Sequence, residues 1–367
     1  MRVSVRDDLK DFTPCEHGGR ITEASETMPN VLDFSASLNP YVHPRTKSAV
    51  KEALKGAYHY PDHTYRRFRE AVGEYLAVPS SGIVPGNGSV ELIRFCAWAL
   101  LQKGDKVIVP APTFGEYELA CRLSGAEPLI VPAWDEQAFK RELFGALDEE
   151  DIRMVFLCNP NNPTGKVLAR KTVTDIALKC HATNAFLLVD EVFIELSDQR
   201  QSVATENLDE AFVLRSLTKS FAIPGIRASY GITNPELANV LNSIRVPWNL
   251  NSIADGVTVA LLEDCKPYLD ASREKIAAQR RWLTRELKKI PGLRPLESDA
   301  NFIMVNVAGT SLSSTDFAGE MRRCGFLVRD CQSFRLTGDD YIRIAVRTKP
   351  ENARLLEAVN RVSNQNF

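Results

Sequence analysis

Short apolar runs alternate with amphipathic stretches through the middle of the chain. Five runs rich in Val, Ile and Leu have the length and continuous apolar character of strands buried in a parallel sheet. They cover residues 106–110, 127–132, 153–158, 185–190 and 211–216, and helical patterns lie at residues 88–102, 114–125 and 169–181. This alternation predicts right-handed βαβ units and a parallel sheet with helices on both faces.

The pattern changes after about residue 250, where the remaining elements fit a smaller α+β unit. A long charged amphipathic helix is predicted at roughly 266–290. Strands at 300–307, 326–330 and 341–346 and helices at 313–325 and 350–362 follow it. The segment 31–40, VLDFSASLNP, is predicted to join the two units. We therefore expect an N-terminal arm with a small-domain segment at 1–44, a large domain at 45–255 and a small C-terminal domain at 256–367.

Composition excludes several classes of function. The net charge of −2 over 367 residues gives no basis for binding nucleic acid or an anionic membrane. No apolar run approaches the roughly 18 residues of a membrane span, and MRVSVRDDLKDF lacks the apolar core of a secretory signal. The eight cysteines form no CxxC pair and the five histidines no HxxxH, so we expect a reducing cytoplasm and no metal site.

Polar residues follow three of the predicted strands, where ligands gather in open α/β sheets. Asp190 ends the run FLLVD, the turn NPNNPTG follows VFLC, and SLTKSF with Lys219 follows AFVLR. Each has an ordinary explanation taken singly, as a cap, a turn or a surface lysine. Together they meet the needs of pyridoxal phosphate, which takes a lysine amine that is neutral near pH 7 and a carboxylate against its ring nitrogen.

The remaining needs of that cofactor also have candidates. Asn162 can donate a hydrogen bond to the phenolic oxygen, and Ser216 and Arg227 can contact the phosphate. The glycine-rich turn GNGS at 86–89 opens an apolar helix, so its backbone amides can hold an anion. Those amides belong to Gly88, Ser89 and Val90.

The motifs GNGS, PTFGEY, NPNNPTG, VDEVF and SLTKSFAIPGIR, in this order, resemble the class I/II aminotransferase group of pyridoxal-phosphate enzymes. The resemblance covers nearly the whole chain. It implies fold type I, an α/β fold whose large domain holds a mostly parallel seven-stranded sheet beside a smaller α+β C-terminal domain. It also implies a homodimer with the active site at the subunit interface.

The same resemblance assigns roles to individual residues. Lys219 resembles the Schiff-base lysine and Asp190 the partner of the ring nitrogen, while Phe114 resembles the aromatic ring stacked on the cofactor or is simply a core residue. Tyr60 resembles the tyrosine that reaches the phosphate of the neighbouring subunit. Phe193 stands where many relatives have a tyrosine bonded to O3′, which leaves that contact to Asn162. The cofactor contacts implied are Gly88, Ser89, Val90, Phe114, Asn162, Asp190, Ser216, Lys219, Arg227 and Tyr60.

Candidate substrate residues come from both ends of the chain. Arg343 resembles the fork that binds the α-carboxylate, and Arg329 resembles the arginine that reads a distal phosphate in histidinol-phosphate aminotransferases. A surface ion pair is the alternative for Arg329, as for Arg347. HGGR at 17–20, LDFSASLNP at 32–40 and VPWNLNSIA at 246–254 resemble the threonine-phosphate decarboxylases, with Arg20 and Ser37 as departures. The substrate contacts implied are His17, Gly18, Gly19, Ser35, Asn39, Asn162, Arg329 and Arg343.

The reaction depends on which bond at the substrate Cα stands perpendicular to the cofactor ring, because the same catalytic residues, Lys219, Asp190 and Phe114, serve both outcomes. We expect decarboxylation of L-threonine O-3-phosphate to (R)-1-amino-2-propanol O-2-phosphate, a step of cobalamin biosynthesis. Transamination of histidinol phosphate or a related amino acid is the alternative. A binding module that has lost its chemistry would have no need of both Lys219 and Asp190, and a purely structural role is still less favoured.

Overall fold

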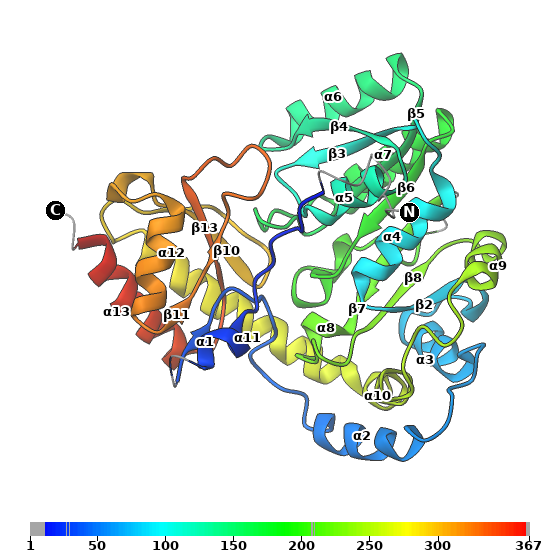
Figure 1. Cartoon of the computed structure of the whole chain (residues 1–367), viewed down its shortest axis with the longest axis horizontal. Coiled ribbons are helices and arrows are strands. Elements are labelled where there is room, and N and C mark those ends of the chain that lie inside the picture. Colours follow the sequence, from blue (N-terminus) through cyan, green and yellow to red (C-terminus); the bar gives the residue numbers. More distant parts are fainter. Residues whose placement is uncertain (1–11, 27, 29, 207, 209, 365–367) are drawn as a thin grey trace, which may run out of the picture.

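The computed structural model describes residues 12–26, 28, 30–206, 208 and 210–364. The prediction that MRVSVRDDLKDF is not a secretory signal concerns residues that lie almost wholly outside the described part of the chain. Two separate groups of strands and helices form the molecule, and the chain passes between them near residue 40 and along the long helix α11 (Figure 1). The division at residues 44/45 and 255/256 stays a prediction.

The larger sheet has seven strands and is mixed but mostly parallel. Its order is β2 (Ile83–Asn87), β8 (Ala228–Ile232), β7 (Ala211–Ser216), β6 (Phe186–Asp190), β5 (Ile152–Cys158), β3 (Lys106–Ala111) and β4 (Glu127–Pro132). Only β8 runs antiparallel to its neighbours, β2 and β7. The five strands predicted from the apolar runs are all present, and the fold class is confirmed.

Helices cover both faces of this sheet. Apolar side chains of α4 (Ser89–Leu100), α5 (Glu116–Leu123) and α9 (Pro235–Ile244) pack on one face. Those of α2 (Thr46–Ala53), α3 (Arg66–Leu76), α6 (Glu136–Glu149), α7 (Arg170–Ala182) and α10 (Ser252–Leu262) pack on the other. Because both faces are buried, the strands are apolar along their whole length, which is the pattern seen in the sequence.

The smaller sheet is antiparallel, with the order β12 (Arg329–Asp330), β13 (Tyr341–Ala345), β10 (Phe302–Asn306) and β9 (Arg294–Pro295). Helices α11 (Cys265–Leu287), α12 (Ser314–Arg323) and α13 (Lys349–Asn364) pack against it. The remaining short helices are α1 (Ile21–Ser25), α8 (Leu217–Ser220) and the 3₁₀ turns η2 (Leu54–Gly56), η3 (Ser80–Gly82), η4 (Ile194–Leu196), η5 (Gln199–Gln201) and η6 (Ala308–Thr310).

The prediction of one strand at 326–330 is wrong, because the structure has two short strands there. The first, β11 (Phe326–Leu327), pairs in parallel with β1 (Leu32–Asp33), and the second, β12, pairs with β13. The chain changes partner at Val328, so one apolar run serves two sheets. Among the described residues, no helix has the length and apolar content that crossing a bilayer requires.

The segment 31–40 connects the small sheet to the lysine-bearing segment. The Phe34 amide donates to the Leu327 carbonyl at 2.7 Å, and the Ala345 amide donates to the Phe34 carbonyl at 2.8 Å. Five residues later, the Asn39 amide donates to the carbonyl of Lys219 at 2.9 Å. These bonds bring residues from both sheets to the same edge of the large sheet.

Candidate active site

One cavity of about 1280 Å³ lies at the carboxyl ends of the parallel strands and is bordered by the N-terminal arm and the small sheet. It gathers most of the residues that the sequence singled out. Those lining it are His17, Gly18, Gly19, Ser35, Ser89, Val90, Phe114, Asn162, Asp190, Lys219, Arg227, Arg329 and Arg343. Gly88, Ser216, Asn39 and Tyr60 do not line it.

Asp190, the last residue of β6, is a buried carboxylate fixed by two donors. The Tyr117 hydroxyl donates to Oδ2 at 2.8 Å and the Val192 amide donates to Oδ1 at 3.0 Å. Burial nevertheless raises the pKa of Asp190 to about 6, because the low-dielectric surroundings disfavour its charge more than these bonds favour it. The carboxylate therefore has a fixed direction and lacks a cation that would fully stabilise it.

Lys219 lies on the short helix α8, which follows β7 directly. Burial, together with the charges of Arg343 and Arg227, lowers the pKa of its amine to about 8. At pH 7.5 about a quarter of such amines are neutral, compared with about one in a thousand for an unshifted lysine. The neutral amine is the nucleophilic form, so the site favours attack by Lys219 on a carbonyl carbon.

The turn before α4 and Arg227 form an anion-binding corner. Gly88 has φ of 91°, and a Cβ at this position would lie 2.1 Å from Nη2 of Arg227. Only glycine therefore allows the guanidinium to pack this closely on the turn. Ser89 and Val90, the first residues of α4, line the cavity beside Arg227, where backbone amides and the helix dipole favour an anion.

Ser216 lies beneath this corner, and Thr218 faces the cavity instead. The Ser216 hydroxyl accepts from the Ser229 hydroxyl at 2.7 Å and from the Thr218 amide at 3.2 Å, and it donates to the Ala228 carbonyl at 3.2 Å. These contacts occupy the hydroxyl, so its role as a phosphate ligand stays a prediction. Sequence reasoning missed Thr218, although its place one residue before Lys219 could have indicated it.

Arg343, in the middle of β13, is buried with its guanidinium in the cavity. Nη2 donates to the Ser35 carbonyl at 2.8 Å, Nη1 donates to Oδ1 of Asn162, and the group lies 5.1 Å over the ring of Phe302. Its Nε has no hydrogen-bond partner within the described part of the chain. Burial lowers the pKa of Arg343 to about 10. An anionic ligand in the cavity would offset this unfavourably buried charge.

Arg329 is the cross-strand partner of Arg343, since β12 and β13 pair these two residues directly. Its Nη2 donates to the Glu16 carbonyl at 2.9 Å and to Oγ of Ser333 at 2.6 Å, and its Nη1 lies 3.3 Å from Oε2 of Glu16. Two like charges at paired positions repel each other. Their burial together at one cavity favours a ligand that carries more than one negative charge.

The N-terminal arm, residues 12–19, approaches this pair through its two glycines. The Gly19 amide donates to Oγ of Ser35 at 2.8 Å, and a Cβ on Gly18 would lie 2.4 Å from the Ser35 carbonyl oxygen. Asp33 in turn accepts from the Ser35 hydroxyl at 2.6 Å. The glycines thus permit a backbone contact that brings His17 over the ring of Phe114, at 5.7 Å between ring centroids.

Three further residues of interest, Asn39, Tyr60 and Arg20, lie outside the cavity, and a fourth, Ser37, lines it. The Asn39 amide group donates to the Ser220 carbonyl at 2.9 Å and to the Tyr268 hydroxyl at 2.7 Å, so it supports the lysine segment. Tyr60 is 78% exposed and stacks on Trp248 at 4.3 Å. Arg20 is exposed and does not line the cavity, whereas Ser37 lines it, is buried, and has a hydroxyl with no hydrogen-bond partner among the residues that the structure describes.

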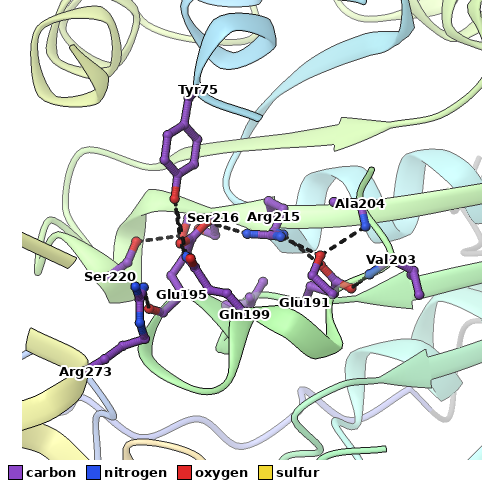
Figure 2. Close-up of polar contacts among 12 residues, drawn as sticks. Tyr75, Glu191, Glu195, Gln199, Val203, Ala204, Arg215, Ser216, Ser220 and Arg273 are labelled. Carbon is purple, nitrogen blue, oxygen red and sulfur yellow. Dashed lines mark hydrogen bonds and ion pairs between the residues drawn. The ribbon is translucent and has the colours of Figure 1, made fainter. Parts of the chain in front are cut away.

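A buried charge network lies directly behind the strand ends that carry Asp190 and Lys219. Figure 2 shows Arg215, on β7, between the carboxylates of Glu191 and Glu195. Its Nε donates to Glu191 at 2.8 Å and its Nη2 donates to Oγ of Ser202 at 2.7 Å. The Tyr75 hydroxyl, from α3, donates to Glu195 at 2.7 Å. The network fixes the backbone next to the two central residues of the site.

The fold and the cavity together define a pyridoxal-phosphate-dependent enzyme of fold type I. The buried carboxylate of Asp190, the partly neutral amine of Lys219 and the anion corner at Arg227 fit the ring nitrogen, the aldehyde and the phosphate of that cofactor. Residues 29–359 match the family model of class I and II aminotransferases. The chain belongs to this family, which confirms the expected family and cofactor.

Individual relatives carry two different names. The chain is 32% identical over 350 residues to a histidinol-phosphate aminotransferase of Methanopyrus kandleri, covering 90% of this chain and 88% of that protein. It is 33% identical over 352 residues to a Caldanaerobacter subterraneus protein named "Putative threonine-phosphate decarboxylase", covering 94% and 93%. The solved histidinol-phosphate aminotransferase of Sinorhizobium meliloti with pyridoxal-5′-phosphate superposes with a TM-score of 0.89 at 21% identity, covering 98% and 97%. That likeness supports the fold.

Proposed function

We propose that this enzyme decarboxylates L-threonine O-3-phosphate to (R)-1-amino-2-propanol O-2-phosphate in cobalamin biosynthesis. The observation that carries the proposal is the pair of buried arginines, Arg329 and Arg343, at the cavity that contains Lys219. A substrate with an α-carboxylate and a phosphate would supply one anion to each. The HGG arm, which contacts Ser35 beside Arg343, and Phe193 in place of a tyrosine favour the decarboxylase.

Of the cofactor contacts proposed from the sequence, Ser89, Val90, Phe114, Asn162, Asp190, Lys219 and Arg227 line the cavity, and Gly88, Ser216 and Tyr60 do not. Lys219 would bind the aldehyde carbon, Asp190 would pair with the ring nitrogen, Asn162 would face the phenolic oxygen and Phe114 the ring. Arg227 and the first amides of α4 would bind the phosphate, and we add the hydroxyl of Thr218 to them. Bound pyridoxal phosphate supplies an electron sink for a bond broken at the substrate Cα. The residues of the chain decide which bond that is, by holding the substrate in one rotation.

Transamination of histidinol phosphate or a related amino acid remains the second candidate, and the name of the Methanopyrus kandleri relative, histidinol-phosphate aminotransferase, supports it. Histidinol phosphate has a phosphate but no carboxylate, so it would offer one anionic group to Arg329 and Arg343, whereas an amino-acid phosphate would offer two. The N-terminal arm and the two arginines would hold the substrate in the rotation that decides whether its bond to the carboxylate or its bond to hydrogen is broken.

One incubation separates the two reactions. The holoenzyme receives L-threonine O-3-phosphate without any keto acid, and carbon dioxide and the cofactor spectrum are followed together. Sustained release of carbon dioxide with the aldehyde form regenerated supports the proposal. Accumulation of the amine form of the cofactor, with turnover of histidinol phosphate only when 2-oxoglutarate is present, would overturn it. The Lys219→Ala variant is the control, because it measures any release of carbon dioxide that does not require Lys219.

We also propose a homodimer in which Tyr60 enters the partner's site. Tyr60 and its stacking neighbour Trp248 are exposed in the single chain, at 78% and 44%. Exposed aromatic pairs of this kind are common at protein interfaces. Sedimentation of the holoenzyme as a monomer at micromolar concentration would contradict the proposal. Tyr60→Ala should weaken cofactor retention without changing the fold.

A further inference from the structure

Two ion pairs and one histidine–carboxylate contact join segments that border the cavity. The segments are the N-terminal arm, helix α5, and the loop at residues 331–340 that joins β12 to β13. Glu16 of the arm pairs with Arg329 of β12, His17 of the arm pairs with Glu116 of α5, and Arg335 of the loop pairs with Glu118 of α5. All six residues line the cavity. Helix α5 is therefore bound to both the arm and the loop, and the arm is also bound to β12, the strand that precedes the loop.

Helix α5 contributes two carboxylates from its first turn, and they reach different partners. Glu116 is buried, and its Oε1 lies 3.0 Å from Nε2 of His17 while Oε2 accepts from Arg94 at 2.7 Å. Glu118 accepts a bidentate fork from Arg335, at 2.9 Å from Nε and 2.7 Å from Nη2. Residues two apart on a helix point in different directions, so one turn can hold two separate segments.

The two carboxylates are largely withdrawn from solvent, whereas their partners His17 and Arg335 are 47% and 59% exposed. The side chain of Glu116 is 4% exposed and that of Glu118 is 15% exposed, so neither carboxylate is freely solvated. A planar guanidinium that donates two parallel bonds fixes direction as well as distance. Both carboxylates also lie at the helix N-terminus, where the macrodipole favours negative charge.

We propose that Glu116 and Glu118 are positioning residues for substrate binding, which hold the arm and the 331–340 loop over the cavity. Neither has to touch the substrate. Glu116 keeps His17 and, through it, Glu16 and the two glycines in place beside Ser35 and Arg329. Glu118 keeps Arg335 and its loop in place, and with them Ser333, which binds Arg329. The inference rests on the proposed function only in taking this cavity as the substrate site.

The chain contains its own reporter for the arm. Cys15 is partly buried and packs on Gly115, the residue before α5, so an arm that leaves α5 uncovers its thiol. Of the other described cysteines, Cys324 is also partly exposed and the rest are buried. In a Cys324→Ser background, the rate at which a neutral maleimide labels Cys15 measures how often the arm opens. The measurement uses the free holoenzyme, so it does not depend on which reaction the enzyme catalyses.

The test compares Glu116→Gln, Glu118→Gln and Arg335→Gln with Glu320→Gln, which removes an exposed ion pair with Arg323 on α12, away from the cavity. We expect KM to rise about tenfold in each of the first three variants while kcat changes less than twofold, as for loss of a charged hydrogen bond in binding. Glu118→Gln/Arg335→Gln should be no worse than either single variant. Glu320→Gln should behave as the parent.

Labelling of Cys15 should accelerate about tenfold in Glu116→Gln. Because burial and, after it, the Glu116 carboxylate raise the pKa of the Cys15 thiol, the rate is measured across pH, which separates altered ionisation from altered access. Unchanged KM in both Glu118→Gln and Arg335→Gln, with an unchanged circular dichroism spectrum, would overturn the proposal even if Glu116→Gln does not fold. If the parent enzyme has no decarboxylase activity but Cys15 is still labelled faster in Glu116→Gln, the positioning role is supported and only the proposed decarboxylation is rejected.

Discussion

Replacing Asp190 with asparagine should stabilise the cofactor-free protein, and by an amount that depends on pH. The native pKa of Asp190 is about 6, compared with an ordinary 3.8. Between these two values the native chain binds more protons than the unfolded chain, so the free energy of unfolding falls as pH rises from 4 to 6. A shift of about two units corresponds to about 3 kcal/mol, which persists above pH 6. Asp190→Asn removes this penalty, while its amide oxygen can still accept from the Val192 amide and its amide nitrogen can donate to the Tyr117 hydroxyl.

Urea unfolding of the cofactor-free parent and Asp190→Asn at pH 4, 5, 6 and 8 tests this reasoning. The two unfolding free energies should differ by less than about 1 kcal/mol at pH 4, and the variant should be more stable by up to about 3 kcal/mol at pH 8. Asp198→Asn is the control of opposite sign: the bond to Arg200 lowers the pKa of Asp198 to about 2, so this variant should be less stable than the parent at pH 8. Adding pyridoxal phosphate should reverse the order of parent and Asp190→Asn, since a ring cation stabilises only the carboxylate. A variant that is less stable at pH 8 without cofactor would refute the burial argument.

Three further substitutions or conditions give separate tests. Capture of pyridoxal phosphate by the cofactor-free chain should accelerate with pH around a midpoint near 8, the pKa of Lys219, and a midpoint near 10 in absorbance kinetics would contradict this. Arg215→Met should cost about 3–5 kcal/mol in unfolding free energy because two buried carboxylates lose their partner, whereas Arg200→Met at an exposed pair should cost less than about 1 kcal/mol. Gly231→Ala should lower the denaturation midpoint because its Cβ would fall 1.7 Å from the Phe212 ring, and Phe212→Leu in the same chain should restore part of the loss. If Phe212→Leu does not restore stability to the Gly231→Ala chain, the clash with the Phe212 ring is not the cause of the loss.

The sequence predicted the strands whose apolar pattern is continuous and missed those whose sequence contains strand-breaking residues. Strand β2 is IVPGN and strand β8 is ASYGI, and both contain a glycine for a packing reason. A Cβ on Gly86 would lie 2.4 Å from Leu92, and Gly231 faces Phe212. Glycine and proline lower strand propensity in the sequence, while the need for close packing that selects them is visible only in three dimensions.

The candidate site was predictable where residues end a strand and hidden where they belong to an apolar helix. Asp190, Asn162 and Lys219 follow strands, so the sheet brings them together. In the sequence pattern, Tyr117 occupies one apolar position of α5. Its spacing does not indicate that its hydroxyl donates a hydrogen bond to Asp190. The contacts of Glu116 and Glu118 likewise join segments far apart in sequence, and local pattern carries no information about them.

Asp190 and Lys219 define the chemistry of the cavity because they do not neutralise each other. A close salt bridge would lower the pKa of the carboxyl and raise that of the amine. The shifts run the other way, up to about 6 for Asp190 and down to about 8 for Lys219, and their mutual attraction is a minor contribution to both. Tyr117 and Val192 hold the carboxylate in its own direction, so each group is left partly unsatisfied. A ligand that offers a ring cation to Asp190 and an aldehyde carbon to Lys219 relieves both at once, and that pair of needs selects pyridoxal phosphate over a simple anion.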